Sequence, residues 1–297
     1  MKNYAEDFNS FLVNEKKSSK NTIESYMRDL NKFFAYCDIN KVKTIEKVTG
    51  DVVKKYEQFM LFNGQSEASV MRTIASLRCY FNYLLREKYI LESPMLNIEK
   101  HRVVKKLPQI LSNKEVIQLL NQPDGRDYKS CRDKAMLELL YATGIKVSEL
   151  IEIKISDINV QIGILHMRGD DKKAERILPI YPQAIKAIKN YLNLVRDVVV
   201  INPNEDRLFT NMNGQPLTRQ GFWKIVKFYA SAAKINKDIT PHTLRHSFAA
   251  HLLENGAPLS DIQEMLGHSD ISSTQVYAQL MKNKYAAAYK KYHPLAN

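Results

Sequence analysis

The sequence predicts a mainly α-helical protein with a small β-sheet, arranged as two domains. Apolar side chains recur at helical spacing through the first hundred of its 297 residues. Two short segments with strand character flank a polar turn between residues 164 and 180. A basic segment bracketed by Pro94 and Pro108 separates the two patterns. A chain of this length can bury two cores, so we expect an N-terminal helical domain followed by a mixed α/β domain.

Four amphipathic helices are expected in the N-terminal domain, each marked by an apolar stripe. The strongest stripe begins at Ile23, behind the cap candidates Ser18 and Ser19. The stripes are Tyr4, Phe8, Phe11 and Leu12; Ile23, Tyr26, Met27, Leu30, Phe33 and Phe34; Val53, Tyr56 and Met60; and Val70, Ile74, Leu77, Phe81 and Leu84. We expect their aromatic residues to form the core of this domain and not a platform for stacking bases.

The second domain alternates between helical and extended patterns. Ser112 and Glu115 form a capping-box pattern that predicts a helix through Leu120. A second helix is expected from 132 to 141, ended by Thr143-Gly144. Strands are expected at 151–153, 164–167 and 176–180, the last two joined by a polar hairpin at 168–175. Helices are expected at 182–196, 218–233, 241–255 and 258–266.

The charge of the chain indicates a polyanionic partner. The net charge is +12, and residues 1–110 carry 19 Lys and Arg against 13 Asp and Glu, so each part of the chain contributes +6. Nucleic acid and an anionic membrane surface both fit this excess, but the longest apolar run is too short to span a bilayer. Cys37, Cys79 and Cys131 form no metal motif, and we expect reduced thiols in the cytoplasm.

A spaced set of polar residues in the last third carries the candidate chemistry. His242 and Arg245 lie one turn apart at a helix start, where free N–H groups and the helix dipole favour a phosphate. The alternative for this pair is structural, with His242 capping the helix and Arg245 pairing with a carboxylate. Leu266-Gly267-His268 follows, and Tyr277 lies nine residues beyond His268.

The combined motif set resembles that of the tyrosine recombinases, the integrase family. It comprises His242-x-x-Arg245, Leu266-Gly267-His268, Tyr277 and, about a hundred residues upstream, Ala142-Thr143-Gly144 with Val147-Ser148-Glu149-Leu150. Chain length and the helical N-terminal half are similar to the Xer subgroup of bacterial recombinases. The resemblance implies a DNA-clamp domain at 1–98, a basic linker at 99–110, and a catalytic domain of tyrosine-recombinase type at 111–297 that ends in a tail for subunit exchange.

The resemblance also implies a role for each residue. Tyr277 would attack the scissile phosphate to give a 3′-phosphotyrosine and a free 5′-hydroxyl. Arg245 and the residue at 146 would clamp the non-bridging oxygens. His242 and His268 would hydrogen-bond the phosphate, and His242 would also take the tyrosine proton. The phosphotyrosine conserves the bond energy, so neither a cofactor nor a metal is expected.

Two positions depart from the family pattern. The lysine that protonates the leaving 5′-oxygen usually lies in a Gly-Lys-Gly-type turn, but here the hairpin reads Gly169-Asp170-Asp171-Lys172-Lys173. Counting back from Glu175 favours Lys172 and leaves Lys173 as the alternative. At position 146 lysine stands where the family has arginine, which keeps the charge and loses the planar fork that binds two oxygens. We therefore expect impaired cleavage.

The implied partner is a double-stranded DNA recombination site. Lys100, Arg102, Lys105 and Lys106 in the linker are the candidate backbone contacts, with a solvated charge run as the alternative. The resemblance implies a homotetramer on two duplexes, formed by exchange of the tail from Met281 to Asn297, although the tail could instead fold back on its own domain. A second recombinase or a DNA translocase is a further implied partner, and the expected location is the nucleoid in the cytoplasm.

Several functional hypotheses remain open at this level. The first is site-specific recombination, for resolving chromosome dimers or integrating a mobile element. The second is a DNA-binding relative that has lost cleavage through Lys146. A topoisomerase-like nicking enzyme is a third.

Overall fold

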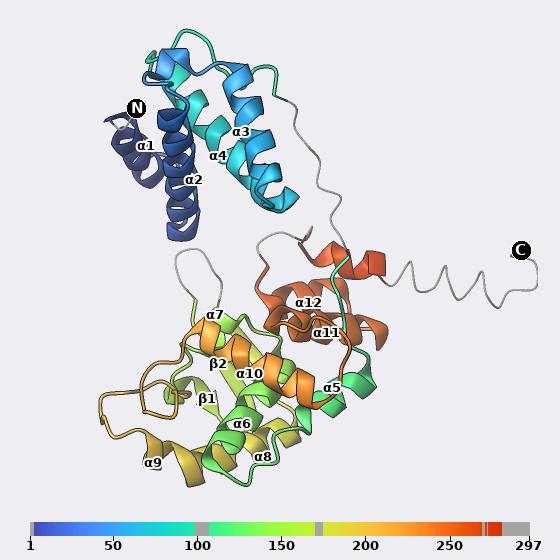
Figure 1. Cartoon of the computed structure of the whole chain (residues 1–297). Coiled ribbons are helices and arrows are strands. Elements are labelled where there is room, and N and C mark those ends of the chain that lie inside the picture. Colours follow the sequence, from blue (N-terminus) through green and yellow to red (C-terminus); the bar gives the residue numbers. More distant parts are fainter. Residues whose placement is uncertain (1–2, 99–106, 170–174, 269–270, 272, 281–297) are drawn as a thin grey trace, which may run out of the picture. The chain divides into compact units, whose positions relative to one another are not determined.

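The computed structural model describes residues 3–98, 107–169, 175–268, 271 and 273–280. Contacts within the chain divide it into two compact units, Met1–Lys105 and Lys106–Asn297 (Figure 1). Three predicted features lie outside the described residues: the linker cations Lys100, Arg102, Lys105 and Lys106, the hairpin lysines Lys172 and Lys173, and the tail from Met281.

The first unit contains the four expected helices. They are α1 (Asn3–Asn14), α2 (Lys20–Ile39), α3 (Gly50–Phe62) and α4 (Glu67–Arg86), with a short 3₁₀ turn at Ile45–Lys47. The side chain of Ser19 accepts a hydrogen bond from the Thr22 amide, and that of Ser66 from the Ser69 amide. These contacts satisfy amides that have no partner within the helix, so the two longest helices begin where the sequence provides a cap.

Aromatic side chains fill the core of the first unit, as predicted. Phe8, Phe33 and Phe81 are fully buried. The ring centroids of Phe8 and Tyr80 lie 5.2 Å apart with an edge-to-face angle of 78°, and those of Phe33 and Phe81 lie 6.2 Å apart at 85°. This geometry suits aromatic packing and leaves the faces of these rings unavailable to nucleic-acid bases.

The second unit combines helices with a three-stranded sheet. Its helices are α5 (Asn113–Leu120), α6 (Tyr128–Thr143), α7 (Val147–Leu150), α8 (Pro182–Tyr191), α9 (Asp197–Val199), α10 (Arg219–Ala232), α11 (Pro241–Glu254) and α12 (Leu259–Leu266). Residues 273–280 are also helical. Strands β1 (Ile158–Asn159), β2 (Ile164–Met167) and β3 (Arg176–Pro179) form an antiparallel sheet in the order β1-β2-β3, with Leu165 opposite Leu178 and Met167 opposite Arg176. The expected capping box at Ser112 is present.

The strand predicted at 151–153 is wrong. These residues form a turn after α7, and the first strand is Ile158–Asn159. The Ile153 carbonyl accepts a hydrogen bond from the Leu208 amide at 2.7 Å, so the segment pairs with a distant loop. Ile151 and Ile153 flank a polar residue, and both are buried in the core. The sequence therefore shows the apolar–polar alternation of a strand, although the backbone forms a turn.

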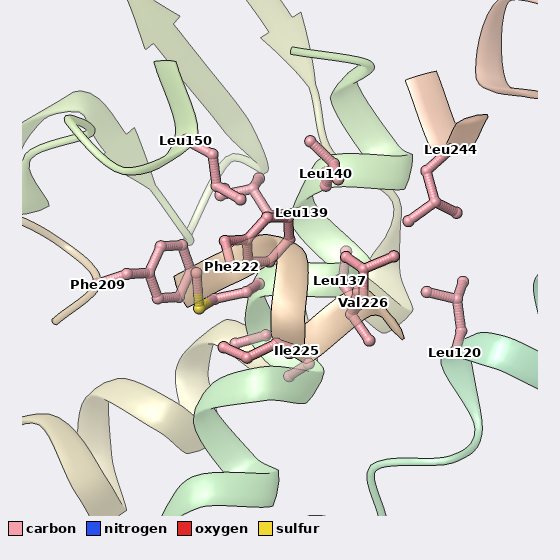
Figure 2. Packing of buried hydrophobic residues seen from close by; sticks show 14 of the residues in the cluster. Leu120, Leu137, Leu139, Leu140, Leu150, Phe209, Phe222, Ile225, Val226 and Leu244 are labelled. Carbon is pink, nitrogen blue, oxygen red and sulfur yellow. The ribbon is translucent and has the colours of Figure 1, made fainter. Parts of the chain in front are cut away.

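Helix α6 lies at the centre of the second unit. It packs against α5, α8 and α11, and Leu137, Leu139 and Leu140 are all fully buried. Figure 2 shows these leucines clustered with Phe222, Ile225 and Val226 of α10 and with Leu244 of α11. Burial on nearly every side fixes the end of α6, and the candidate site begins at that end.

The described part of the chain includes no helix that is long and apolar enough to cross a membrane.

Candidate active site

The start of α11 presents three polar side chains. Thr240 and Thr243 cap the helix reciprocally: each hydroxyl accepts a hydrogen bond from the other residue's amide, at 3.3 and 3.1 Å. Pro241 occupies the first turn, where its missing N–H costs nothing. His242, Arg245 and His246 then follow at spacings of three and four, so they share one side of the helix. His242 is exposed and Arg245 is buried.

Arg245 joins three separate segments. One terminal nitrogen of its guanidinium donates to the Gly144 carbonyl at the end of α6, at 2.6 Å. The other donates to the Leu266 carbonyl at 2.7 Å and contacts Nε2 of His268 at 3.0 Å. A guanidinium cannot accept a hydrogen bond, so Nε2 of His268 is the acceptor. Arg245 therefore fixes the ends of α6 and α12 relative to α11.

His268 is neutral in this arrangement. Burial, followed by the charges of Arg245 and Lys146, lowers its pKa to about 4. Because Nε2 accepts from Arg245, the single ring proton lies on Nδ1, which donates to the Thr274 hydroxyl at 2.9 Å. Thr274 belongs to the helical segment 273–280 that carries Tyr277. His268 thereby couples Arg245 to the segment that bears the candidate nucleophile.

Tyr277 is buried, and its hydroxyl contacts His246. Only 1% of the side chain is exposed, and it packs with Phe248, Ile262 and Leu266. Its hydroxyl lies 2.8 Å from Nδ1 of His246. Burial raises the pKa of Tyr277, and the positive charge of Arg245 acts against that rise. Tyr277 is therefore a protonated phenol whose attack on an electrophile requires a proton acceptor.

Lys146 lies close to both candidate histidines. The pKa values of His242 and His268 are lowered most by burial and next by the charge of Arg245. The charge of Lys146 is the third cause in both cases. Lys146 immediately precedes α7, and its backbone amide donates to a Glu149 carboxylate oxygen at 2.8 Å. The lysine ammonium therefore adds positive charge to the place where Arg245, His242 and His268 converge.

A buried ion pair connects the sheet to these helices. Arg176 on β3 donates to the second Glu149 oxygen at 3.0 Å and to the Met265 carbonyl at 2.9 Å. Both side chains are at least nine-tenths buried. Glu149 accepts a hydrogen bond from the Lys146 amide, and Met265 lies three residues before His268. Arg176 therefore links β3 to the segments that carry Lys146 and His268.

Two glycines allow the close approach of these groups. Gly144 ends α6 with φ 61°, and a Cβ there would lie 2.2 Å from the Phe248 ring. Gly267 ends α12 with φ 62°, and a Cβ there would lie 2.5 Å from the Arg176 guanidinium. Both positions combine a left-handed backbone with a neighbour that leaves no room for a side chain.

The structure thus brings together five of the residues singled out in the sequence: Lys146, His242, Arg245, His268 and Tyr277. Their assigned roles remain predictions, as does that of Lys172, which lies outside the described residues. No role is predicted from the sequence for His246 or Arg176. A signal for His246 existed, since it follows His242 by one helical turn, but only the fold brings it to Tyr277.

The structural alternative for His242 and Arg245 does not agree with the described contacts: Thr240 caps α11, and the Arg245 guanidinium contacts carbonyl oxygens and a histidine and not a carboxylate. Among the described residues, no group of three or more His, Cys, Asp or Glu side chains is arranged to hold a metal ion.

Known families match both units of the chain. The model described as "Phage integrase family" matches residues 109–284, and "Phage integrase, N-terminal SAM-like domain" matches residues 5–88. The chain is 43% identical over 296 residues to the tyrosine recombinase XerD of Staphylococcus haemolyticus, covering 100% of both chains. It is 45% identical over 293 residues to the tyrosine recombinase XerD of Oceanobacillus iheyensis, covering 98% of both chains.

Solved structures share this fold. The XerH site-specific recombinase in a post-cleavage complex with a palindromic difH substrate gives a TM-score of 0.78 at 22% identity, covering 96% of this chain and 84% of that one. The XerA recombinase gives 0.55 at 25% identity, covering 98% and 99%.

Proposed function

Because this chain belongs to the phage integrase family and is an Xer-type tyrosine recombinase, an enzyme that cleaves and rejoins DNA strands at specific sites, we propose that Tyr277 is its nucleophile. The observation that carries this proposal is the convergence on one place of a buried phenol, Arg245, His268 and Lys146. A phosphodiester and its pentavalent transition state are anionic, and this place concentrates positive charge.

The first step transfers the phosphate to the protein. The Tyr277 oxygen gives its proton to a histidine of α11 and forms a bond to phosphorus. The bond from phosphorus to the 5′-oxygen breaks, and the 5′-oxygen leaves with a proton supplied by Lys172. Arg245, Lys146, His242 and His268 bind the non-bridging oxygens. A 5′-hydroxyl from another strand then attacks the 3′-phosphotyrosine, and the reverse step releases Tyr277 with the strands exchanged.

Phosphate binding changes the role of His268. In the DNA-free protein its Nε2 accepts a hydrogen bond from Arg245, so it cannot donate to an anion there. A phosphate at this place supplies negative charge, which opposes the effect of Arg245 and Lys146 and raises the pKa of the imidazole. Protonation of Nε2 then converts His268 into a donor, so DNA binding and proton uptake are linked.

Lys146 makes this enzyme slower than one with arginine at that position. An ammonium supplies charge without the planar pair of donors that matches two phosphate oxygens. Loss of one transition-state donor of this kind costs about 3 kcal/mol, or about a hundredfold in rate. Lys146 also raises a second candidate function, that of a relative that binds DNA without cleaving it. A slow recombinase still forms the covalent adduct, whereas that relative forms none.

A suicide duplex nicked beside the cleavage position separates the two candidates. The short fragment diffuses away after cleavage and traps the covalent protein–DNA adduct. We expect an adduct in the parent protein and in Lys146→Arg, and none in Tyr277→Phe, which should still bind the duplex. Tight binding without an adduct, even in Lys146→Arg, would support the non-cleaving relative.

For the biological role, we propose resolution of chromosome dimers on DNA at the nucleoid in the cytoplasm. Support comes from the match to XerD proteins, which covers the whole chain. Selection of binding sites from the host genome, followed by footprinting, tests the role. One site near the replication terminus is the expected result, whereas sites at the ends of a mobile element would favour integration.

We further propose a homotetramer on two duplexes, held by the tail from Met281 to Asn297, with a second recombinase or a DNA translocase as an additional partner. Removal of residues 281–297 is expected to leave binding to a single site intact and to abolish the complex of two sites in a gel-shift experiment. A tail that folds back on its own domain would leave the two-site complex unchanged.

A further inference from the structure

We propose that His246 is a catalytic residue that takes the hydroxyl proton of Tyr277 when the tyrosine attacks the scissile phosphate. This role was expected of His242 on the basis of the family resemblance. The inference rests on the proposed function, because it requires Tyr277 to be the nucleophile.

The buried hydroxyl of Tyr277 fixes the direction of its hydrogen bond. With 1% of the side chain exposed, the phenol proton needs an acceptor within the protein. Nδ1 of His246 lies 2.8 Å from the hydroxyl oxygen. If Nδ1 carried a proton, the phenol oxygen would accept and its own proton would lose this partner. The favoured tautomer of His246 therefore has its proton on Nε2 and a lone pair on Nδ1 directed at Tyr277.

The neighbouring groups are less suited to receive this proton. Arg245 and Lys146 are cations without an acceptor lone pair. Both nitrogens of His268 are engaged, Nε2 by Arg245 and Nδ1 by the Thr274 hydroxyl. His242 is exposed at the start of α11, and its ring centroid lies 6.4 Å from that of His246. Its position suits a phosphate ligand, while His246 occupies the contact with the nucleophile.

The charges around His246 link its basicity to DNA. Burial, His242 and Arg245 lower the pKa of His246 to about 4, so in the DNA-free protein it is a neutral and weak base. Tyr277 is itself neutral, and the other charged groups of the site, Arg176 and Lys146, act on His268 beside it. A scissile phosphate adds negative charge among these cations and increases the proton affinity of His246. Substrate therefore activates the base.

The proton balance of both half-reactions is complete with this assignment. During cleavage the proton moves from the Tyr277 oxygen to Nδ1 as the oxygen–phosphorus bond forms, giving an imidazolium beside the phosphate. During rejoining the Tyr277 oxygen is the leaving group and takes the proton back from the same imidazolium, while the attacking 5′-hydroxyl gives its proton to Lys172, which cleavage left neutral. His246 ends the cycle neutral, as it began.

The test measures adduct formation on the suicide duplex in single-turnover experiments with full-length protein carrying Lys146→Arg. His246→Asn retains an amide oxygen that can accept a hydrogen bond but takes up no proton. We expect it to slow adduct formation by about a hundredfold or more. His251→Asn removes another histidine of α11, one that contacts Tyr141 and the Leu111 carbonyl, and is expected to keep the rate. Thermal unfolding of each variant checks folding.

A tyrosine analogue with a more acidic hydroxyl at position 277 shows whether His246 acts by taking the proton or by positioning the nucleophile. Fluorinated tyrosine at position 277 reduces the need for a base, so it should restore much of the rate lost in His246→Asn and little of that lost in His242→Asn. An unchanged rate in His246→Asn, or rescue of His242→Asn alone, would overturn the inference while leaving the proposed function intact. If the Lys146→Arg protein without a further substitution forms no adduct, the proposed function and this inference are both overturned.

A second measurement does not depend on activity. ¹⁵N NMR of the DNA-free protein should show His246 with an unprotonated Nδ1 whose shift changes in Tyr277→Phe. A protonated Nδ1 that is insensitive to Tyr277→Phe would contradict the assignment.

Discussion

His246 and His268 are half-buried beside cations, and this environment makes each of them neutral. Both have pKa values lowered to about 4, with burial as the largest cause and Arg245 as a further one. His246 accepts from the Tyr277 hydroxyl, and His268 accepts from Arg245. In the DNA-free protein, Nδ1 of His246 and Nε2 of His268 are therefore both hydrogen-bond acceptors. Protonation of either ring would break a hydrogen bond that holds the site together.

The pKa of these histidines predicts how stability depends on pH. In the unfolded chain they titrate near 6.5 and in the folded chain near 4, so the unfolded state binds more protons between these values. Stability is therefore full above pH 6.5 and decreases as the pH falls toward 4, by about 1.4 kcal/mol per pH unit for each histidine. Urea unfolding at pH 7, 6 and 5 measures this slope. His268→Asn should reduce it; an equal slope in this variant would argue against a neutral His268.

Gly144 offers a second prediction at the residue scale. Gly144→Ala places a methyl group 2.2 Å from Phe248 and also forces alanine into a left-handed conformation. We expect a loss of about 2–5 kcal/mol, the sum of the two costs. Gly125→Ala is the matched control, because Gly125 has φ 73° with nothing within 4 Å of its Cβ. Urea denaturation should show the larger loss for Gly144→Ala. Equal losses would mean that Phe248 moves away without cost.

At the scale of elements, the pair Arg176–Glu149 aligns β3, α7 and the end of α12. Arg176→Met leaves the Glu149 carboxylate buried without this cation, and we expect a loss of about 3–5 kcal/mol. The double variant Arg176→Met, Glu149→Leu removes both charges and should recover much of that stability. Adduct formation should stay slow in the double variant, since the Lys146 amide and the Met265 carbonyl have lost their partners. Recovery of both stability and rate would show that the pair has no positioning role.

The helices were predictable from sequence because their signals are local. Ser19 and Ser112 cap the helices that follow them, as predicted, and the residues of the stripe predicted for α4 are buried. The turn at 151–153 was misread as a strand because Ile151 and Ile153 are buried by the tertiary packing of the second unit, which a local pattern does not contain. The link between His246 and Tyr277 spans 31 residues, and only the fold reveals it.

At the scale of the whole molecule, the net positive charge is divided evenly, with +6 in residues 1–110 and +6 in the remainder. An even division suits a protein that contacts a duplex with both of its units. The basic linker is the segment whose role the charge pattern leaves open, because a solvated run and a phosphate contact have the same composition.

Salt dependence distinguishes these roles of the linker. Replacing Lys100, Arg102, Lys105 and Lys106 with glutamine should reduce the slope of log K against log salt by up to about 3.6, if each contacts one phosphate. The loss of affinity should be similar for cognate and random duplexes. As a control, glutamine at the exposed Lys186 and Lys189 on α8 should leave the slope unchanged. An unaltered slope in the linker variant would show that the linker is solvated.

The most direct test of the whole account compares the parent with Lys146→Arg in single-turnover cleavage of the suicide duplex. The fold brings Arg245, His268 and Tyr277 together, and we propose that Lys146 is the position that limits the rate of cleavage. The account predicts adduct formation in both proteins, with the arginine variant faster by about a hundredfold. Equal rates in the two proteins, or an adduct that persists in Tyr277→Phe, would contradict it.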